Sequence, residues 1–173
     1  MDALAGPVVV ACVLLALAGG LKLLRPAPTA GALRAMRLPS SRLLVQTLGI
    51  GELVLGVATV ATFARPLLVL VAAAYIAFAG FVVVALQSDT PLQSCGCFGQ
   101  ADTPPSGAHV VVNLAAAGTL CAAGLTGPSG LDVILPDQPW SAVPFVLLVI
   151  VCSYLCVVML TVLPLTMRAR TAA

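Results

Sequence analysis

Charged side chains are scarce in this sequence. Eight basic and six acidic residues among 173 make up 8% of the chain, whereas 61% of the residues are hydrophobic. A soluble domain carries about 25% charged residues, while a lipid bilayer accepts apolar side chains on the outside of a helix bundle. The composition therefore excludes an ordinary water-soluble domain and predicts an all-α integral membrane protein. With a net charge of only +2, nucleic-acid binding has no support either.

Five long apolar runs fill most of the chain, and each is long enough to cross a bilayer. They comprise residues 7–24, 43–63, 66–86, 108–125 and 143–165. We therefore predict a four-helix membrane core in residues 1–125, an outer-side loop in 126–142, and a fifth transmembrane helix with a basic tail in 143–173. The first run lacks a basic segment before it and has Asp2 there instead, so we expect a retained span rather than a cleaved signal peptide.

The connections between the runs differ in length. Only Ala64, Arg65 and Pro66 separate the second run from the third, which predicts an antiparallel helical hairpin. The first connection, residues 25–42, contains four arginines, and its apolar residues between 32 and 38 alternate loosely with Arg34 and Arg37. This pattern predicts a short helix that lies in the membrane interface.

Basic residues are distributed unevenly between the two sides of the membrane. If the N-terminus is outside, the four arginines of the first connection, Arg168 and Arg170 face the cytoplasm, and Arg65 alone faces outward. Six arginines on one side against one on the other predict an outside N-terminus, a cytoplasmic C-terminus and a cytoplasmic segment 87–107. Because Arg outnumbers Lys seven to one and Ala is abundant, as in GC-rich bacterial genomes, we expect a multi-pass protein of the bacterial inner membrane.

Cys95 and Cys97 lie one residue apart in segment 87–107, with Gly96 between them. Such a pair closes into a disulfide only through a tight, strained ring, and strained disulfides exchange readily. We therefore predict that Cys95 and Cys97 are a catalytic redox pair. Two other interpretations stay open: a pair of small apolar side chains at the membrane surface, or a clamp for Cu(I) or Zn.

The other four cysteines, Cys12, Cys121, Cys152 and Cys156, lie within the apolar runs. Cys152 and Cys156 share one helix face because they are four residues apart. A redox relay across the bilayer is one interpretation of these residues. We favour the alternative, in which they are small apolar side chains of the helices.

Lys22 and Glu52 interrupt the apolar runs. A carboxylate near the bilayer centre is costly unless it is paired or protonated, so Glu52 is a candidate functional residue. Gly49, Glu52 and Gly56 share one face, on which another helix can approach closely. Lys22 has two interpretations: its ammonium snorkels to the headgroups, or it pairs with Glu52, although helix arithmetic separates the two depths by about 10 Å.

His109, the single histidine, begins the fourth run, and Asn113 follows on the same helix face. An imidazole close to a thiol promotes its thiolate form, although a histidine at a helix start is more often an interfacial residue. We predict a supporting polar pocket that opens to one membrane side. Its residues are Lys22, Glu52, His109 and Asn113, together with the Cys95 and Cys97 pair.

Four groups of residues resemble the MauE family of methylamine-utilisation membrane proteins. These are the run from Ala18 to Pro26, Gly51-Glu52-Leu53 with Gly56, Cys95-Gly96-Cys97-Phe98-Gly99, and His109 with Asn113. The resemblance covers about residues 5–125 and implies a DoxX-like four-helix bundle. It also implies a role in maturing the disulfide-rich small subunit of periplasmic methylamine dehydrogenase alongside a thioredoxin-like partner, with Cys95 and Cys97 as the redox pair.

We therefore expect an accessory protein that supports thiol–disulfide maturation of an exported client, and leave open whether it is itself an oxidoreductase. No cofactor and no bound metal are predicted. The rival functions are a quinone-linked membrane oxidoreductase with its ligand at Glu52, a Cu or Zn transporter or chaperone that uses Cys95, Cys97 and His109, and a structural assembly subunit.

Overall fold

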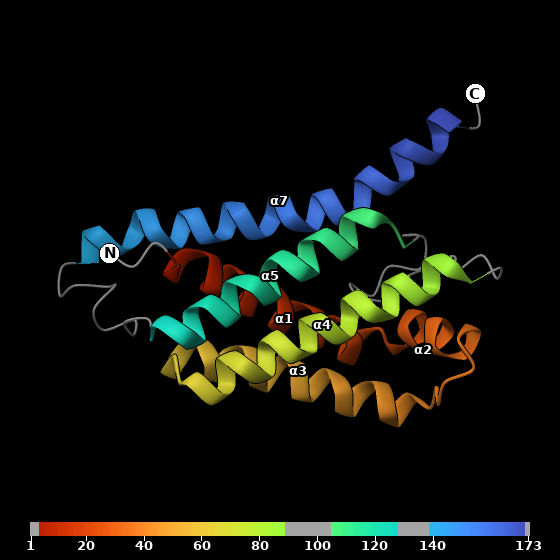
Figure 1. Cartoon of the computed structure of the whole chain (residues 1–173), viewed down its shortest axis with the longest axis horizontal. Helices are drawn as coiled ribbons and strands as arrows, with labels where there is room; N and C mark the ends of the chain where they lie inside the picture. The colour runs from red at the N-terminus through yellow and green to blue at the C-terminus, as the bar shows by residue number, and fades with distance from the viewer. Residues whose placement is uncertain (1–3, 89–104, 128–138, 172–173) are drawn as a thin grey trace.

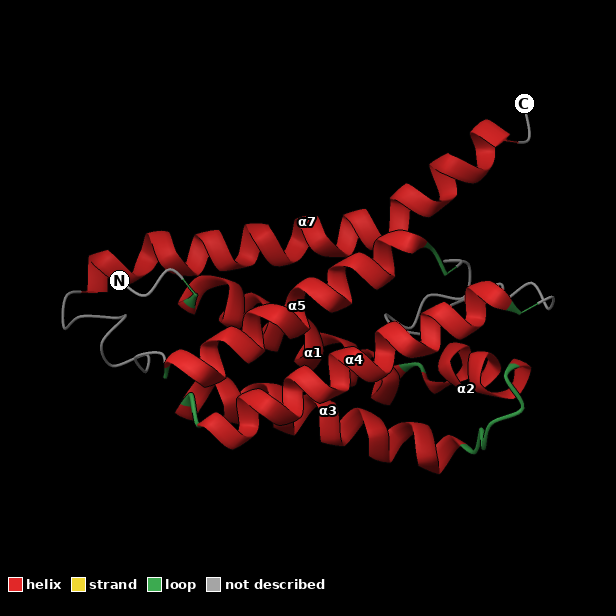
Figure 2. Cartoon of the chain, in the orientation of Figure 1, coloured by secondary structure: helices red, strands yellow, loops and turns green. Residues whose placement is uncertain are grey.

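The computed structural model describes residues 4–88, 105–127 and 139–171. Within these ranges every regular element is a helix and there is no strand (Figure 2). The helices are α1 (Ala5–Leu24), α2 (Pro26–Ala35), α3 (Arg42–Thr62), α4 (Arg65–Gln87), α5 (Gly107–Thr126) and α7 (Pro139–Thr171). All except α2 are long and apolar enough to span a membrane, which confirms the predicted all-α fold with five spans.

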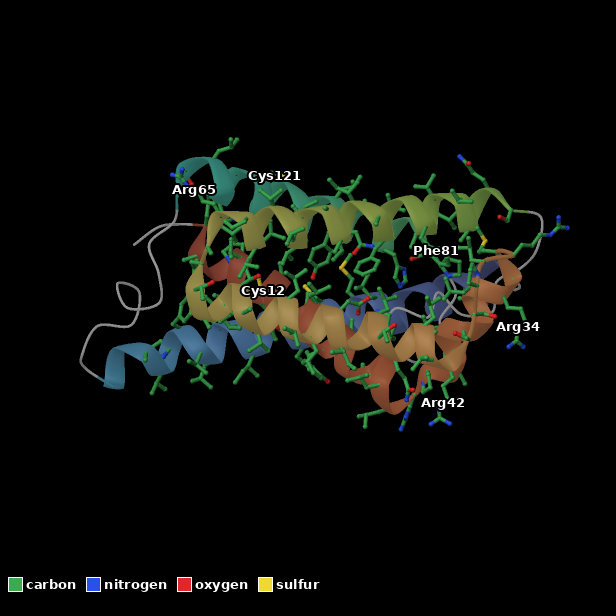
Figure 3. All side chains as sticks on the ribbon, turned by 90° about the horizontal axis from the view of Figure 1, so that it is seen from below. Cys12, Arg34, Arg42, Arg65, Phe81 and Cys121 are labelled. Atoms are coloured by element: carbon green, nitrogen blue, oxygen red, sulfur yellow. The ribbon has the colours of Figure 1, made fainter. Side chains whose placement is uncertain are left out.

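The five spanning helices run alternately up and down (Figure 1). At one end of the bundle α1 ends, α3 begins, α4 ends and α5 begins, and α2 lies there as well. Arg34 and Arg42 project at this end, whereas Arg65 lies at the opposite end (Figure 3). Arg25 and Arg37 flank α2, so we call this the arginine-rich end.

The connection between α3 and α4 is the predicted tight hairpin. Phe63 ends α3 with φ +49°, and its N–H donates to the carbonyl of Thr59 at 2.8 Å. A left-handed conformation costs a residue with a Cβ about 1–2 kcal/mol. Burial of the Phe63 ring, which is 6% exposed in the hydrophobic core, offsets that cost. The short connection forces α3 and α4 to be antiparallel neighbours.

The short helix α2 differs in its bounds from the prediction, which centred it on residues 32–38. It begins at Pro26, a residue that favours the first helical turn, and ends at Ala35. The chain then turns at Arg37, whose φ of +58° cannot continue a right-handed helix. Thr29 and Ala32 are buried where α2 packs against α1 and α3, and Arg34 is exposed.

Helix α1 lies at the centre of the fold and packs against α2, α3, α5 and α7. The outer faces of the spanning helices instead carry exposed leucine, isoleucine and valine side chains. Hydrocarbon solvates such side chains as well as a protein core does. Val149 of α7 belongs to the same hydrophobic core as α1, so the fifth span packs directly onto the four-helix core.

Candidate functional site

Three glycines allow α1 and α3 to approach until their backbones touch. A Cβ at Gly19 would lie 2.5 Å from the carbonyl oxygen of Gly49, and one at Gly49 would lie 2.8 Å from the carbonyl oxygen of Gly19. A Cβ at Gly56 would lie 2.6 Å from the carbonyl oxygen of Cys12. No hydrophobic effect drives helices together in a membrane. Helices pack closely there where small residues let their backbones approach. The face of Gly49, Glu52 and Gly56 therefore contacts α1, as the sequence predicts.

Lys22 and Glu52 form an ion pair at this contact. The ammonium Nζ of Lys22 donates to Oε2 of Glu52 at 2.5 Å, and the two residues are 4% exposed each. The predicted difference in depth of about 10 Å is wrong. A Cβ at Gly49 would lie 3.1 Å from the Cβ of Lys22, so Lys22 is level with Gly49, three residues and about 4.5 Å from Glu52 along α3. The lysine side chain covers that distance easily.

The buried pair also decides between the two interpretations of Lys22. The ammonium does not snorkel to the membrane surface, because it is buried against Glu52. It lies 5.3 Å from the centroid of the Phe78 ring on α4, within the range of a cation–π interaction. Three helices thus contribute to holding one cation inside the bundle.

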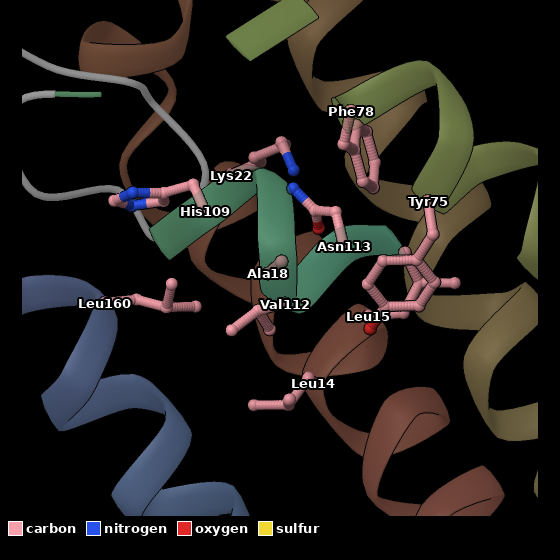
Figure 4. Close-up of a pocket in the computed structure, with 10 residues that line it drawn as sticks. All are labelled: Leu14, Leu15, Ala18, Lys22, Tyr75, Phe78, His109, Val112, Asn113 and Leu160. Atoms are coloured by element: carbon pink, nitrogen blue, oxygen red, sulfur yellow. The ribbon is translucent and has the colours of Figure 1, made fainter. Parts of the chain in front are cut away.

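A small cavity of about 40 Å³ lies beside the ion pair, and ten residues from α1, α4, α5 and α7 line it. Lys22, His109 and Asn113 are the polar members from α1 and α5 (Figure 4). In this view the ends of Lys22 and Asn113 are directed toward one another, and Tyr75 and Phe78 approach from α4. The volume suffices for a few water molecules. The structure thus brings Lys22, His109 and Asn113 to one cavity and joins Glu52 to it through Lys22.

His109 is held at the start of α5. Its Nδ1 lies 2.9 Å from the hydroxyl oxygen of Ser106, the residue that precedes the helix, and the side chain is 1% exposed. Its Nε2 and the Oε1 atom of Glu52 are buried without a hydrogen-bond partner among the described residues. Buried polar atoms of this kind are rare in folded proteins and call for a physical explanation. Both residues belong to the set that the sequence analysis predicts for the supporting pocket.

Tyr75 is a member of this site that the sequence analysis missed. Its hydroxyl donates to the backbone carbonyl of Ala11 at 2.6 Å, and its ring meets Phe78 edge to face at 6.2 Å. Tyrosines of membrane proteins usually lie at the interfaces. A tyrosine in the middle of the third apolar run was therefore a signal that a polar partner exists there.

Cys95 and Cys97 lie outside the described residues. The described chain on either side of them, the end of α4 and the start of α5, lies at the arginine-rich end. The Ser88 hydroxyl lies 3.7 Å from the sulfur of Met36, just after α2. Whether the pair meets the polar cavity stays a prediction.

The cysteines within the spans occupy unlike surroundings. Cys12 is fully buried in the core, Cys121 is exposed, and Cys152 and Cys156 are half-buried on α7. Cys12 therefore has the surroundings of a small apolar side chain. In the part of the chain that the structure describes, no three His, Cys, Asp or Glu side chains come together as metal ligands would.

These features define an all-helical, five-span membrane protein with an ion pair buried between its first two spanning helices and a small polar cavity beside it. Residues 3–127 match the family of the methylamine utilisation protein MauE, and the chain belongs to this family. It is accordingly an accessory membrane protein of methylamine utilisation. No curated protein and no solved structure matches the chain at a significant level.

Proposed function

We propose that this MauE-family protein supports the thiol–disulfide maturation of an exported, disulfide-containing client through Cys95 and Cys97. The observation that carries the proposal is the Cys-Gly-Cys sequence between α4 and α5, in a chain whose family is tied to methylamine utilisation. The client in that setting is the small subunit of methylamine dehydrogenase, and a thioredoxin-like protein is the exchange partner.

The proposed reaction is a thiol–disulfide exchange in two steps. The thiolate of one cysteine attacks a disulfide of the thioredoxin-like partner, which forms a mixed disulfide and releases one partner thiolate. The second cysteine then attacks the mixed disulfide, so that the Cys95–Cys97 disulfide forms and the partner leaves as a dithiol. Two electrons and two protons pass from the cysteine pair to the partner, and a separate dithiol reductant, reacting through the same two exchange steps, restores the pair.

Lys22 and His109 support this chemistry by their position toward the arginine-rich end, because Lys22 lies in the last turn of α1 and His109 in the first turn of α5. Lys22 and His109 line one cavity near the start of α5, and α5 follows the segment that contains the cysteine pair. An imidazole close to a thiol favours the thiolate, which is the reactive form. In this proposal Lys22, Glu52, His109 and Asn113 are positioning residues rather than reacting groups.

Replacing both Cys95 and Cys97 with serine is expected to abolish the protein's contribution to client maturation, because neither half of the exchange can then occur. The measurement is the disulfide content of the methylamine dehydrogenase small subunit in cells that lack the native copy of the protein. The matched control is Cys121→Ser, an exposed cysteine of α5. Normal disulfide content with the double-serine protein, present at normal levels in the membrane, would contradict the proposal.

We further propose that the protein lies in the bacterial inner membrane with its N-terminus outside and its C-terminus in the cytoplasm. The cysteine pair then faces the cytoplasm while its client is exported, so the proposed exchange requires that reducing equivalents cross the bilayer. Four arginines around α2 at one end of the bundle, against Arg65 at the other, support this orientation. In intact cells a membrane-impermeant maleimide is then expected to leave Cys95 and Cys97 unlabelled, with or without prior reduction, and to label them only after lysis. Labelling in reduced intact cells would reverse the orientation.

A further inference from the structure

The turn between α2 and α3 carries two arginines at positions that do not suit them. Arg37 is left-handed with φ +58° and its side chain is exposed, so no burial offsets the cost of that conformation as it does at Phe63. Arg42 is the first residue of α3, where the positive end of the helix dipole disfavours a cation, and no acidic residue lies in that first turn. Folding alone therefore gives no reason for an arginine at either position.

Neither arginine has a counter-charge within the described ranges. Glu52 is the single acidic residue there, and it is buried against Lys22. Both guanidinium groups are exposed, and Figure 3 shows Arg42 projecting away from the bundle. Five residues of chain join Arg37 to Arg42, a span of at most about 18 Å, so two long side chains can reach one ligand. The turn thus offers two cations to an anion from outside the chain.

An exposed leucine follows each of these arginines directly. Leu38 is 46% exposed and Leu43 is 72% exposed. Hydrocarbon solvates such side chains well, and an arginine at the edge of the hydrocarbon extends its charge to the headgroups. A soluble anion or an acidic protein surface would meet only the cations. A phospholipid matches both features, since it joins a phosphate to acyl chains.

We propose that the turn between α2 and α3 binds an anionic phospholipid of the surrounding leaflet. Arg37 and Arg42 donate to its phosphate, which guanidinium groups bind well because they present paired N–H donors. Leu38 and Leu43 lie against its acyl chains. The bound phosphate also compensates the cation at the start of α3. This site goes beyond the proposed exchange function and requires neither cysteine of the pair.

Net charge distinguishes this ligand from other phospholipids. In phosphatidylcholine the choline cation cancels the phosphate charge, whereas phosphatidylglycerol keeps a net negative charge. Each arginine near an anionic lipid surface contributes about 1 kcal/mol, equivalent to about fivefold in affinity. Two arginines are therefore expected to favour phosphatidylglycerol over phosphatidylcholine by about 25-fold.

The test titrates the full-length protein in neutral dodecyl maltoside micelles with each lipid and counts bound lipids by native mass spectrometry. Arg37→Gln and Arg42→Gln are each expected to weaken phosphatidylglycerol binding about fivefold and to leave phosphatidylcholine binding unchanged. Arg65→Gln is the matched control, because it removes an arginine at the opposite end of the bundle. It is expected to keep the wild-type preference.

Arg37→Gly separates lipid binding from misfolding. Glycine adopts the left-handed conformation without the cost of a Cβ, so this variant is expected to be at least as stable as the wild-type protein in micelles without phospholipid. Its preference for phosphatidylglycerol is nevertheless expected to fall as in Arg37→Gln. Added phosphatidylglycerol is expected to raise the unfolding temperature of the wild-type protein more than that of the Arg37→Gly protein.

Four results would overturn the proposal. These are equal affinity for the two lipids, an unchanged preference in the Arg37→Gln and Arg42→Gln proteins, an equal loss in the Arg65→Gln protein, and displacement of phosphatidylglycerol by equimolar glycerol 1-phosphate, which would indicate a site for soluble anions. A protein with serine at Cys95 and Cys97 is expected to keep the lipid preference. Failure of the lipid site and failure of the exchange function are therefore distinguishable.

Discussion

An alanine at Gly19 is expected to destabilise the protein by about 1–3 kcal/mol, the range for overpacking a tight contact. Its methyl group would lie 2.5 Å from the carbonyl oxygen of Gly49 and 2.6 Å from the backbone nitrogen of Leu53. Both atoms belong to the backbone of α3, so neither can move aside as a flexible side chain would. The helices α1 and α3 must separate, and the Lys22–Glu52 pair between them must lengthen.

The neighbouring glycines provide matched controls. A Cβ at Gly20 of α1 or at Gly51 of α3 would meet no atom within 4 Å. Gly20→Ala and Gly51→Ala are therefore expected to be neutral or stabilising by up to about 1 kcal/mol, because alanine favours the helix over glycine. Unfolding by SDS titration in mixed micelles measures the differences. Equal stability of the Gly19→Ala and Gly20→Ala proteins would show that α1 and α3 do not pack as described.

Replacing Lys22 with methionine is expected to destabilise the protein by about 3–5 kcal/mol, the cost of leaving one partner of a buried ion pair uncompensated. The Glu52 carboxylate would then be buried with neither oxygen paired, since its Oε1 already lacks a partner among the described residues. Glu52→Met is expected to have a similar cost, because it leaves the Lys22 ammonium inside the bundle. Both changes are measured by the same unfolding titration.

The double variant Lys22→Met with Glu52→Met shows whether the losses of stability in the two single variants are coupled or simply add. Two apolar side chains of similar volume remove both buried charges, so the double variant is expected to recover most of the stability. Arg34→Met is the control for simple loss of a cation: Arg34 is exposed, and its change is expected to stay within about 0.5 kcal/mol. Additive losses in the double variant would mean that the pair is not coupled.

The double variant also separates a structural from a functional role of the pair. If Lys22 and Glu52 only hold α1 against α3, the stable double variant matures its client normally. The proposed positioning role predicts the opposite, a folded protein in which exchange through Cys95 and Cys97 is impaired. The client's disulfide content, measured as for the double-serine protein, decides between them.

The bounds of the first four spans were predictable to within two residues because the bilayer imposes a simple rule on the sequence, whereas α7 (Pro139–Thr171) extends beyond the predicted run 143–165 at both ends. Each spanning helix needs about 20 apolar residues and must satisfy its own backbone hydrogen bonds. Predicted run 43–63 accordingly differs by one residue at each end from α3 (Arg42–Thr62). The bounds of α2 were less predictable, because an interfacial helix has no such length requirement and its ends depend on Pro26 and on the turn at Arg37.

The relation of Lys22 to Glu52 was not predictable from distances along each helix. Counting residues from the ends of the spans assumes that both helices begin at the same depth. The contact between Gly19 and Gly49 sets a different register, in which the two charged residues are about one turn apart. Tyr75 was missed for the same reason, since its hydrogen bond to the carbonyl of Ala11 depends on which faces of α1 and α4 meet.

The sequence by itself determined that this is a five-span, all-helical membrane protein and which few polar residues its spans contain. Hydrophobic length and the scarcity of charge are properties of the chain alone, because lipid acts on every residue in the same way. Only the tertiary structure decided that Lys22 pairs with Glu52 and that His109 and Asn113 share a cavity with Lys22. Those relations arise from the register and rotation of helices distant in sequence, which small-residue contacts fix in space.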